Sequence, residues 1–205
     1  MLAVGMNPDE AEAVIERFAP QVSVAAVNSS SSVTLAGDTA ALETIAAELT
    51  AAGRFNRFLK VEVPYHSEVM TEIHDELLTA LDGLQAASPE IDVYSTATGS
   101  RMVDDRHDAS YWWQNVRGTV LFADALMAAI SDGHRVFLEI GPHPVLASSI
   151  RDVLGEVGAK GIGITSLQRD AEELETMHSA LHSLHASGAA IDWQTFFGPG
   201  AYTAL

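Results

Sequence analysis

The sequence contains no cysteine in its 205 residues. Disulfides, zinc sites built from thiolates and a cysteine nucleophile are therefore excluded. Basic residues are also scarce, with 11 lysines and arginines against 28 aspartates and glutamates, which gives a formal net charge of −17 at pH 7. Because nucleic acids and anionic membranes would repel such a chain, we expect neither as a partner.

Long apolar runs are missing as well. No run approaches the ~20 apolar residues that a membrane-spanning helix needs, and the opening MLAVGMNPDE lacks the basic and long apolar regions of a signal peptide. We therefore expect a soluble, cytoplasmic protein. Hydrophobic residues still make up 47% of the chain, which is enough for a real core in one ordinary domain or two small ones.

The beginning of the chain predicts the order βαββαβ. A strand in MLAVG is followed by a helix in which Asn7 and Glu10 have capping-box spacing. VSVAAVN and SVTLAGD flank a serine-rich turn as in a hairpin, and a helix follows over 39–53. Apolar and polar residues then alternate over 59–63, as in a half-buried last strand. This order is that of a ferredoxin-like unit.

Strands and helices alternate through the rest of the chain, which favours a parallel sheet with covered faces. We expect helices or turns over 67–84, 109–118, 119–133 and 144–155, strands over 91–99, 135–140 and 161–167, a polar helix over 168–188 and an extended tail over 189–205. The run EIGPHPVL, at 139–146, reads as a corner between a strand and a helix.

His66 is the first candidate for chemistry, because it stands where the strand of VEVPYHSEVM gives way to a helix. Its imidazole could take up and return a proton near neutral pH. A lone histidine is, however, more often structural or merely exposed. No GxSxG pentapeptide, the nucleophile elbow of hydrolases, occurs in the sequence. Either the chemistry is not of the Ser/His type, or the serine lies outside this chain.

Two further clusters have an ordinary interpretation beside a functional one. His178, His182 and His185 share a helical face, but a solvated surface is favoured because no HExxH arrangement accompanies them, and we predict no metal. Arg54, Arg57 and Lys60 form the densest basic cluster. They could blunt a strand edge or meet an anionic partner.

Four segments in order make the sequence resemble the C-terminal part of the acyltransferase domain of type I polyketide synthases. They are VSVAAVNSSSSVTLAGD, VEVPYHSEVM, YWWQNVRGTVLFADAL and EIGPHPVLASSI. The segment from SLQRDAEELE to GAAIDW resembles the linker that follows that domain, so the similarity covers nearly the whole chain.

The resemblance implies an α/β fold in which a ferredoxin-like small subdomain accompanies an α/β-hydrolase-like large one. It implies transfer of a malonyl-type unit from coenzyme A, through a serine ester, to the phosphopantetheine thiol of an acyl carrier protein. No cofactor would be bound, and acyl-CoA would be a substrate. The expected boundaries are 1–63 for the small subdomain, 64–157 for the C-terminal part of the large one, and 158–205 for the last strand and the linker.

The resemblance also implies roles for individual residues. The family's catalytic histidine falls on His66, and the residue whose carbonyl orients it falls on Asn115. Its four-residue specificity motif falls on Val63, Pro64, Tyr65 and His66. The bulky Tyr65 favours malonyl, although Val63 and Pro64 match neither standard pattern. Asn28 corresponds to an asparagine near the pocket wall.

The family's serine elbow, oxyanion glutamine and substrate-binding arginine belong to the N-terminal part of the domain, and their motifs are absent here. We therefore expect the chain to be inactive alone and to need that N-terminal part as a partner, together with a carrier protein and neighbouring synthase domains. The alternative is a non-catalytic docking module in which Arg54, Arg57 and Lys60 meet an acidic carrier protein. An unrelated α/β hydrolase fragment is disfavoured, because the order of the motifs would then be a coincidence.

Overall fold

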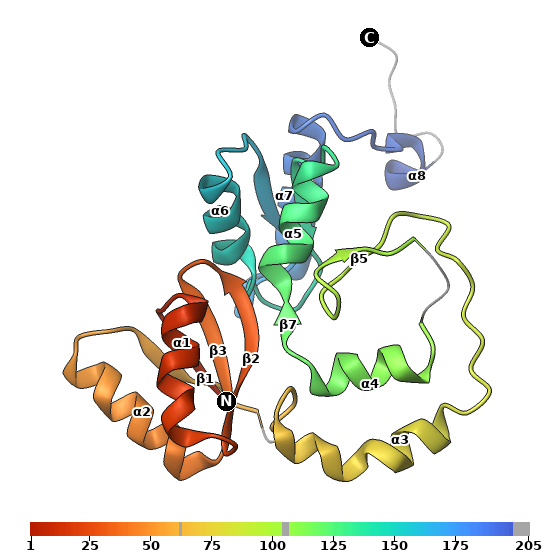
Figure 1. The fold of residues 1–205 in the computed structure, drawn as a ribbon. Coiled ribbons are helices and arrows are strands. Elements are labelled where there is room, and N and C mark those ends of the chain that lie inside the picture. The colour runs from red at the N-terminus through yellow and green to blue at the C-terminus, as the bar shows by residue number, and fades with distance from the viewer. Residues whose placement is uncertain (62, 104–106, 199–205) are drawn as a thin grey trace. The chain divides into compact units, whose positions relative to one another are not determined.

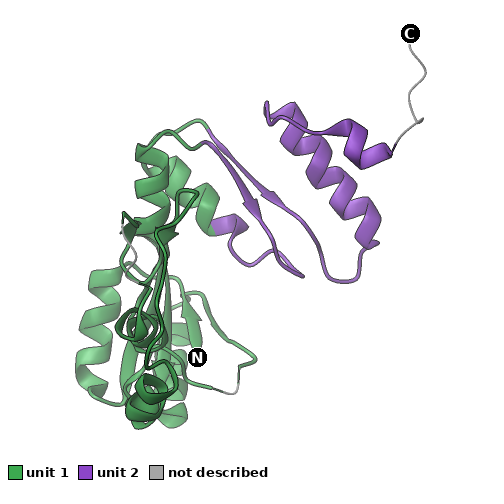
Figure 2. Cartoon of the chain, turned by 90° about the vertical axis from the view of Figure 1, so that its right-hand side faces the viewer, with its two compact units in different colours: residues 1–134, 149–160 green, residues 135–148, 161–205 purple. Residues whose placement is uncertain are grey.

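The computed structural model describes residues 1–61, 63–103 and 107–198. Their contacts divide the chain into two compact units, shown in Figure 2: unit 1 comprises residues 1–134 and 149–160, and unit 2 comprises residues 135–148 and 161–205. These units are defined by contacts, and the expected subdomain boundaries after residues 63 and 157 stay a prediction. Residues 64–134 share a unit with the first 63 because a strand near residue 120 joins the N-terminal sheet.

Unit 1 begins with the predicted order of strands and helices (Figure 1). The elements are β1 (Leu2–Val4), α1 (Pro8–Ile15), the 3₁₀ turn η1 (Glu16–Phe18), β2 (Val22–Ser29), β3 (Ser32–Gly37), α2 (Thr39–Ala51) and β4 (Asn56–Phe58). The strand order across the sheet is β4-β1-β3-β2, and each of these neighbours is antiparallel. Strands β1 and β2 thus lie on either side of β3, and α1 connects them.

The two helices of this sheet begin where the sequence predicts. The Asn7 side chain accepts a hydrogen bond from the Glu10 N–H at 2.8 Å, and the Glu10 carboxylate accepts one from the Asn7 N–H. The Asp38 carboxylate accepts from the Ala41 N–H at 2.9 Å and so caps α2. Both helices then pack apolar side chains onto the sheet. The fully buried members of this core include Leu2, Val33, Leu35, Leu42 and Ile45.

The prediction of a last strand over 59–63 is wrong. Strand β4 ends at Phe58, and Lys60 and Val61 lie outside any strand, as does Val63; Glu62 lies outside the described residues. The pairing of β4 with β1 places Phe58 opposite Leu2, and the Leu59 N–H donates to the Met1 carbonyl at 3.0 Å.

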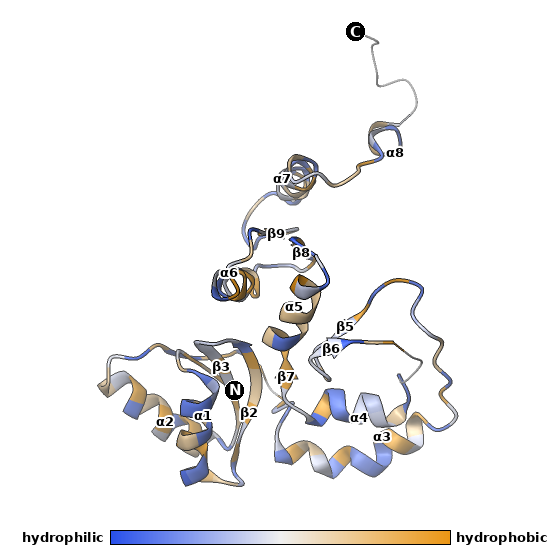
Figure 3. Cartoon of the chain, turned by 45° about the horizontal axis from the view of Figure 1, so that its top comes forward, coloured by the Kyte–Doolittle hydropathy of each residue, from blue (hydrophilic) through white to orange (hydrophobic). Residues whose placement is uncertain are grey.

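Unit 1 continues with short elements rather than long ones. They are η2 (Glu68–Ile73), α3 (His74–Ala80), β5 (Tyr94–Ser95), β6 (Ser100–Arg101), α4 (Ala109–Arg117), β7 (Val120–Leu121) and α5 (Phe122–Ser131). The helix predicted over 67–84 is thus a 3₁₀ turn followed by a short helix, and the strand predicted over 91–99 is a two-residue arm of a hairpin. Strand β7, hydrophobic in Figure 3, pairs with β2 in parallel and completes a five-stranded sheet.

Unit 2 contains the parallel pair β8 (Val136–Glu139) and β9 (Ile162–Thr165), as predicted, and the helix α7 (Glu173–Ala186). Helix α6 (Ala147–Glu156) starts here, and its residues from Ser149 onward belong to unit 1. The tail expected to be extended instead forms a short helix, α8 (Trp193–Phe197), which Asp192 caps. No helix in the described parts of the chain is long and apolar enough to cross a bilayer.

Candidate active site

His66 is held by the C-terminal end of α4. Its main-chain N–H donates to the Val116 carbonyl at 2.9 Å, and its ring Nδ1 lies 2.8 Å from the Gly118 carbonyl oxygen. The side chain is half-buried. Main chain and ring are therefore fixed by the same helix end, although 52 residues separate His66 from Gly118.

The backbone of His66 is unusual, with a φ of 61°. This left-handed region is uncommon for residues other than glycine and costs about 1–3 kcal/mol. The two hydrogen bonds to α4 each contribute about 0.5–1.5 kcal/mol, so together they can offset that cost. Strained residues of this kind cluster at functional sites, and the strain at His66 is consistent with such a role.

The partner of Nδ1 fixes the state of the neutral ring. A carbonyl oxygen only accepts hydrogen bonds, so Nδ1 carries the proton and donates it to Gly118. The lone pair then resides on Nε2. The arrangement gives a ring with one nitrogen anchored and the other available as a proton acceptor, which is the geometry that a general base requires.

The residues before His66 form a tight turn. The Ser67 hydroxyl, 1% exposed, donates to the Pro64 carbonyl at 2.6 Å and closes the turn around Tyr65 and His66. The Tyr65 ring, 47% exposed, lies 6.3 Å from the His66 ring between centroids. Pro64 is half-buried, and Val63 is exposed. The predicted specificity residues thus adjoin the histidine.

Asn115 does not provide the carbonyl that orients His66 in this structure. It lies half-buried within α4, and the carbonyl on Nδ1 belongs to Gly118, just after that helix. The predicted residue, Asn115, thus lies three positions before Gly118 in the same segment. A glycine directly after a helix is a readable stop signal, but which carbonyl meets His66 depends on a long-range contact that no local pattern encodes.

Asn28 lies on β2, and its side-chain amide donates to the Thr34 hydroxyl on β3 at 3.4 Å. The side chain is half-buried. This contact ties Asn28 to the sheet, and its expected place at the pocket wall stays a prediction.

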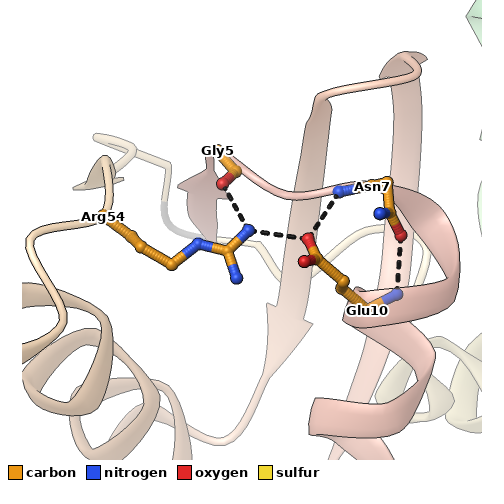
Figure 4. A network of polar contacts seen from close by, with 4 residues as sticks. All are labelled: Gly5, Asn7, Glu10 and Arg54. Carbon is orange, nitrogen blue, oxygen red and sulfur yellow. Dashed lines mark hydrogen bonds and ion pairs between the residues drawn. The ribbon is translucent and has the colours of Figure 1, made fainter.

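The three basic residues of the predicted docking cluster have different surroundings. Arg54 is bound within the fold: its guanidinium donates to the Gly5 carbonyl at 3.0 Å and to the Glu10 carboxylate at 2.6 Å (Figure 4). The bond from Arg54, with that from the Asn7 N–H, lowers the pKa of Glu10. Arg57 and Lys60 are exposed. Arg54 therefore stabilises the start of α1, and only the other two project freely.

Two of the three histidines of α7, His178 and His185, contact aromatic rings of α8. The rings of His178 and Phe196 lie 5.4 Å apart between centroids, and those of His185 and Trp193 lie 5.1 Å apart. These contacts join α7 to α8 inside unit 2. Among the described residues, no three histidine, aspartate or glutamate side chains gather where they could share a metal ion.

The run EIGPHPVL forms a hydrogen-bonded corner. The Glu139 carboxylate accepts from the N–H groups of Val145 and Leu146, at 2.7 and 3.1 Å, just before α6. The Ser166 hydroxyl, buried beyond β9, accepts from the Gly141 N–H at 3.1 Å. The predicted turn between a strand and a helix is present, and these contacts account for its polar residues.

An open pocket of about 320 Å³ lies next to α4 in unit 1. Its lining comprises Thr98, Ser100, Arg101, Met102, Val103, Asp108, Ser110, Tyr111 and Gln114, none of which is a predicted site residue. Several of these side chains already have partners: Gln114 donates to the Ala97 carbonyl, and Tyr111 bonds Ser95. We assign this pocket no chemistry.

The family model for the acyl transferase domain matches residues 1–191. The chain belongs to this family. It is similar to the polyketide synthase GfsB of Streptomyces halstedii, 36% identical over 98% of this chain, and to the erythronolide synthase EryA3 of Saccharopolyspora erythraea, 36% identical over 100% of this chain. The resemblance to acyltransferase domains of type I polyketide synthases is thus confirmed.

Solved structures of acyltransferase domains have a fold similar to that of this chain. The acyltransferase domain from module 8 of the salinomycin polyketide synthase superposes with a TM-score of 0.90 over 95% of this chain, at 29% identity. That from the second module gives 0.87 over 99%, at 33% identity. The chain spans 46% and 48% of these two chains, and 4% and 6% of the two synthases named above. The α/β fold of these acyltransferase domains is therefore the fold of this chain.

Proposed function

We propose that this chain supplies the catalytic histidine of a polyketide synthase acyltransferase, which moves a malonyl-type unit from coenzyme A to the phosphopantetheine arm of an acyl carrier protein. The observation that carries the proposal is the contact between His66 and Gly118, 2.8 Å long, which leaves Nε2 free. A ring with one anchored and one free nitrogen is the form in which histidine activates a serine in acyl transfer.

The proposed reaction has two halves. In the first, a serine hydroxyl attacks the thioester carbonyl of the acyl-CoA, and its proton passes to Nε2 of His66. Collapse of the tetrahedral intermediate releases the coenzyme A thiolate, which takes that proton and leaves an acyl-serine ester. In the second half, His66 removes the proton from the carrier protein's thiol, the thiolate attacks the ester, and the proton returns to the serine oxygen.

We further propose that the turn before His66 shapes the acyl pocket. Tyr65 is the residue directly before the base, and its ring lies 6.3 Å from the His66 ring between centroids. A side chain of this size leaves less room for a branch at the α-carbon of the acyl group than a serine would. Malonyl is accordingly the favoured unit, with Val63, Pro64 and Asn28 as further wall residues.

The serine itself is proposed to come from a segment outside these 205 residues. The sequence contains no GxSxG elbow, and several apolar side chains around His66 are exposed, including Val61, Val63 and Val69. Exposed apolar side chains that form a contiguous patch often mark an interaction surface. We infer that residues 1–63 form a ferredoxin-like subdomain, that 64–157 belong to a larger α/β-hydrolase-like subdomain, that 158–205 contain the last strand and the linker, and that the chain alone does not turn over.

Reconstitution tests this proposal. The purified chain is assayed for malonyl transfer from malonyl-CoA to a carrier protein, alone and fused to an N-terminal acyltransferase segment that contains a GHSxG elbow. We expect no transfer by the chain alone and transfer by the fusion, with loss of transfer in the fusion on His66→Ala. Transfer by the chain alone would overturn the proposed division of the site, and transfer by the His66→Ala fusion would overturn the role of the histidine.

A docking function is the second candidate, and one surface favours it. Arg57 and Lys60 are exposed on and just after the edge strand β4, where Phe55 and Phe58 are 62% and 43% exposed. Basic and apolar side chains side by side suit an acidic partner such as a carrier protein. The affinity of the chain for a carrier protein should fall as the salt concentration rises and on Arg57→Glu. An affinity that neither change alters would rule out this surface as the docking site.

A further inference from the structure

The end of α4 holds the segment around His66 at three consecutive residues. The Val116 carbonyl accepts from the His66 N–H, the Gly118 carbonyl meets the His66 ring, and the Arg117 guanidinium forms an ion pair with the Glu68 carboxylate. The first two contacts act on the histidine itself. The third acts two residues beyond it, at the start of η2.

The contacts on the two sides of His66 differ in kind. On its N-terminal side, the turn is closed by the Ser67 hydroxyl, which bonds the Pro64 carbonyl. The Ser67 hydroxyl makes no capping bond to η2, which starts without a side-chain cap. Glu68 is the first residue of η2, and its ion pair with Arg117 attaches this start to α4.

The ion pair between Glu68 and Arg117 is important because the backbone of His66 is left-handed. A residue other than glycine with a φ of 61° relaxes toward an ordinary conformation unless its surroundings hold it. Such a relaxation would rotate the segment after His66 away from α4 and withdraw Nδ1 from the Gly118 carbonyl. A tether at Glu68 opposes that rotation at the point where it would begin.

We propose that Glu68 and Arg117 are positioning residues that keep His66 in its left-handed conformation, so that Nδ1 stays on Gly118 and Nε2 stays free. The inference rests on the proposed function, because it gives the pair its purpose through the role of His66 as a base. Neither residue is assigned a contact with substrate.

A simpler role for the pair is general surface stability. The Arg117 and Glu68 side chains are 30% and 56% exposed, and ion pairs with that exposure change stability little. The two roles predict different measurements. A positioning pair alters the state of the His66 ring when it is broken, whereas a surface pair leaves that ring unchanged.

The ring can be observed directly in the 205-residue chain, without turnover. Long-range proton–nitrogen NMR spectra of the uniformly ¹⁵N-labelled chain distinguish the two neutral tautomers of each histidine, and His66→Gln identifies the signals of His66. The variants are Glu68→Gln, Arg117→Gln and the charge exchange Glu68→Arg with Arg117→Glu. Glu48→Gln is the matched control, because it breaks the ion pair of Arg17 with Glu48, which is 54% and 49% exposed.

We expect the wild-type ring to populate the tautomer with the proton on Nδ1, as the contact with Gly118 requires. Each single variant should shift the His66 signals toward those of a mixed population, the charge exchange should shift them back, and Glu48→Gln should leave them in place. Single variants whose His66 signals match the wild type would overturn the proposal. If Arg117→Gln fails to fold, Arg117→Lys, which keeps the charge but loses the fork of donors, should show a smaller shift in the same direction.

The reconstituted fusion gives a second readout. Misplacement of a catalytic group by about 1 Å can cost about 100-fold in rate, so Glu68→Gln should lower kcat by about 10-fold to 100-fold with little change in KM. An unchanged kcat would count against the positioning role. If the wild-type fusion showed no transfer at all, the proposed function would fail, while the tautomer measurement would still decide whether the pair positions the ring.

Discussion

The Nδ1 atom of His66 lies 2.8 Å from the carbonyl oxygen of Gly118. This single contact joins a strained turn to the end of a helix 52 residues further along the chain. It assigns the proton of the neutral ring to Nδ1 and leaves Nε2 as the acceptor. Substitutions at Gly118, Ser67, Tyr65 and Arg54 would test this contact, the turn that carries His66 and the helix start beside the sheet.

Gly118→Ala should displace the carbonyl that holds His66. A Cβ at this position would lie 2.7 Å from the Gln114 carbonyl oxygen, which is too close to be accommodated without movement of the helix end. We expect transfer by the reconstituted fusion to fall by about 10-fold to 100-fold, measured as kcat. Gly155→Ala is the control, because a Cβ there meets nothing within 4 Å; it should leave kcat unchanged.

Ser67→Ala should destabilise the turn that presents Tyr65 and His66. The substitution removes the donor to the Pro64 carbonyl from a position that is only 1% exposed. Loss of one partner of a buried hydrogen bond costs about 1–3 kcal/mol, which urea unfolding of the chain would measure. Ser110→Ala, at an exposed position, should change the free energy of unfolding by less than about 0.5 kcal/mol. Equal effects of the two substitutions would contradict the role of the Ser67 bond.

Tyr65→Ser should widen the proposed acyl pocket. A small side chain before His66 leaves space for the extra methyl group of methylmalonyl-CoA, and one methyl group in a pocket is typically worth about 10-fold to 200-fold in selectivity. We expect the ratio of kcat/KM for methylmalonyl-CoA over malonyl-CoA to rise by at least about 10-fold in the fusion. Tyr65→Phe retains the bulk and should keep the wild-type ratio. A ratio that is unaffected by Tyr65→Ser would remove this residue from the pocket wall.

Arg54→Gln should raise the pKa of Glu10 toward its usual value. The hydrogen bond from Arg54 is the main cause that lowers the pKa of Glu10 below its usual 4.5. A carboxyl whose pKa is lowered by folding stabilises the protein above its ordinary pKa, and this contribution disappears as the pH falls through the lowered value. The variant should therefore be less stable than the wild type near neutral pH, and the difference should shrink below pH 4.5.

An NMR titration of the Glu10 carboxyl would measure this change. The pKa of Glu10 should rise in Arg54→Gln, while Arg17→Gln, which removes a surface ion pair elsewhere, should leave it in place. A Glu10 titration that is identical in wild type and Arg54→Gln would show that the Arg54–Glu10 bond in Figure 4 does not persist in solution.

Local patterns predicted the parts of this fold that depend on neighbouring residues. The capping bonds of Asn7 and Asp38 join residues three positions apart, and both could be placed from spacing alone. The end of β4 could not, because it depends on the pairing of β4 with β1, a strand that is distant in the sequence. The single helix predicted from residue 67 is a 3₁₀ turn followed by a short helix, a difference that apolar spacing does not encode.

The candidate site likewise has a part that follows from the sequence and a part that depends on long-range contacts. His66 was found through the resemblance of its segment to a family, and Tyr65 followed from its adjacent position. The carbonyl on His66 was assigned to Asn115, whereas Gly118 provides it. The contact lies in the segment that the family motif marks, and the residue that supplies the carbonyl depends on how α4 ends against the turn. Glu68 and Arg117 show no motif spacing in the sequence, and only the folded chain brings them together.

The strand β7 begins two residues after Gly118 and is hydrogen-bonded along β2, while the Thr119 hydroxyl between them donates to the Val24 carbonyl at 2.8 Å. The carbonyl that holds the histidine is therefore tied to the N-terminal sheet through the residues that directly follow it. The position of the His66 ring depends on that sheet as well as on the turn that carries the histidine.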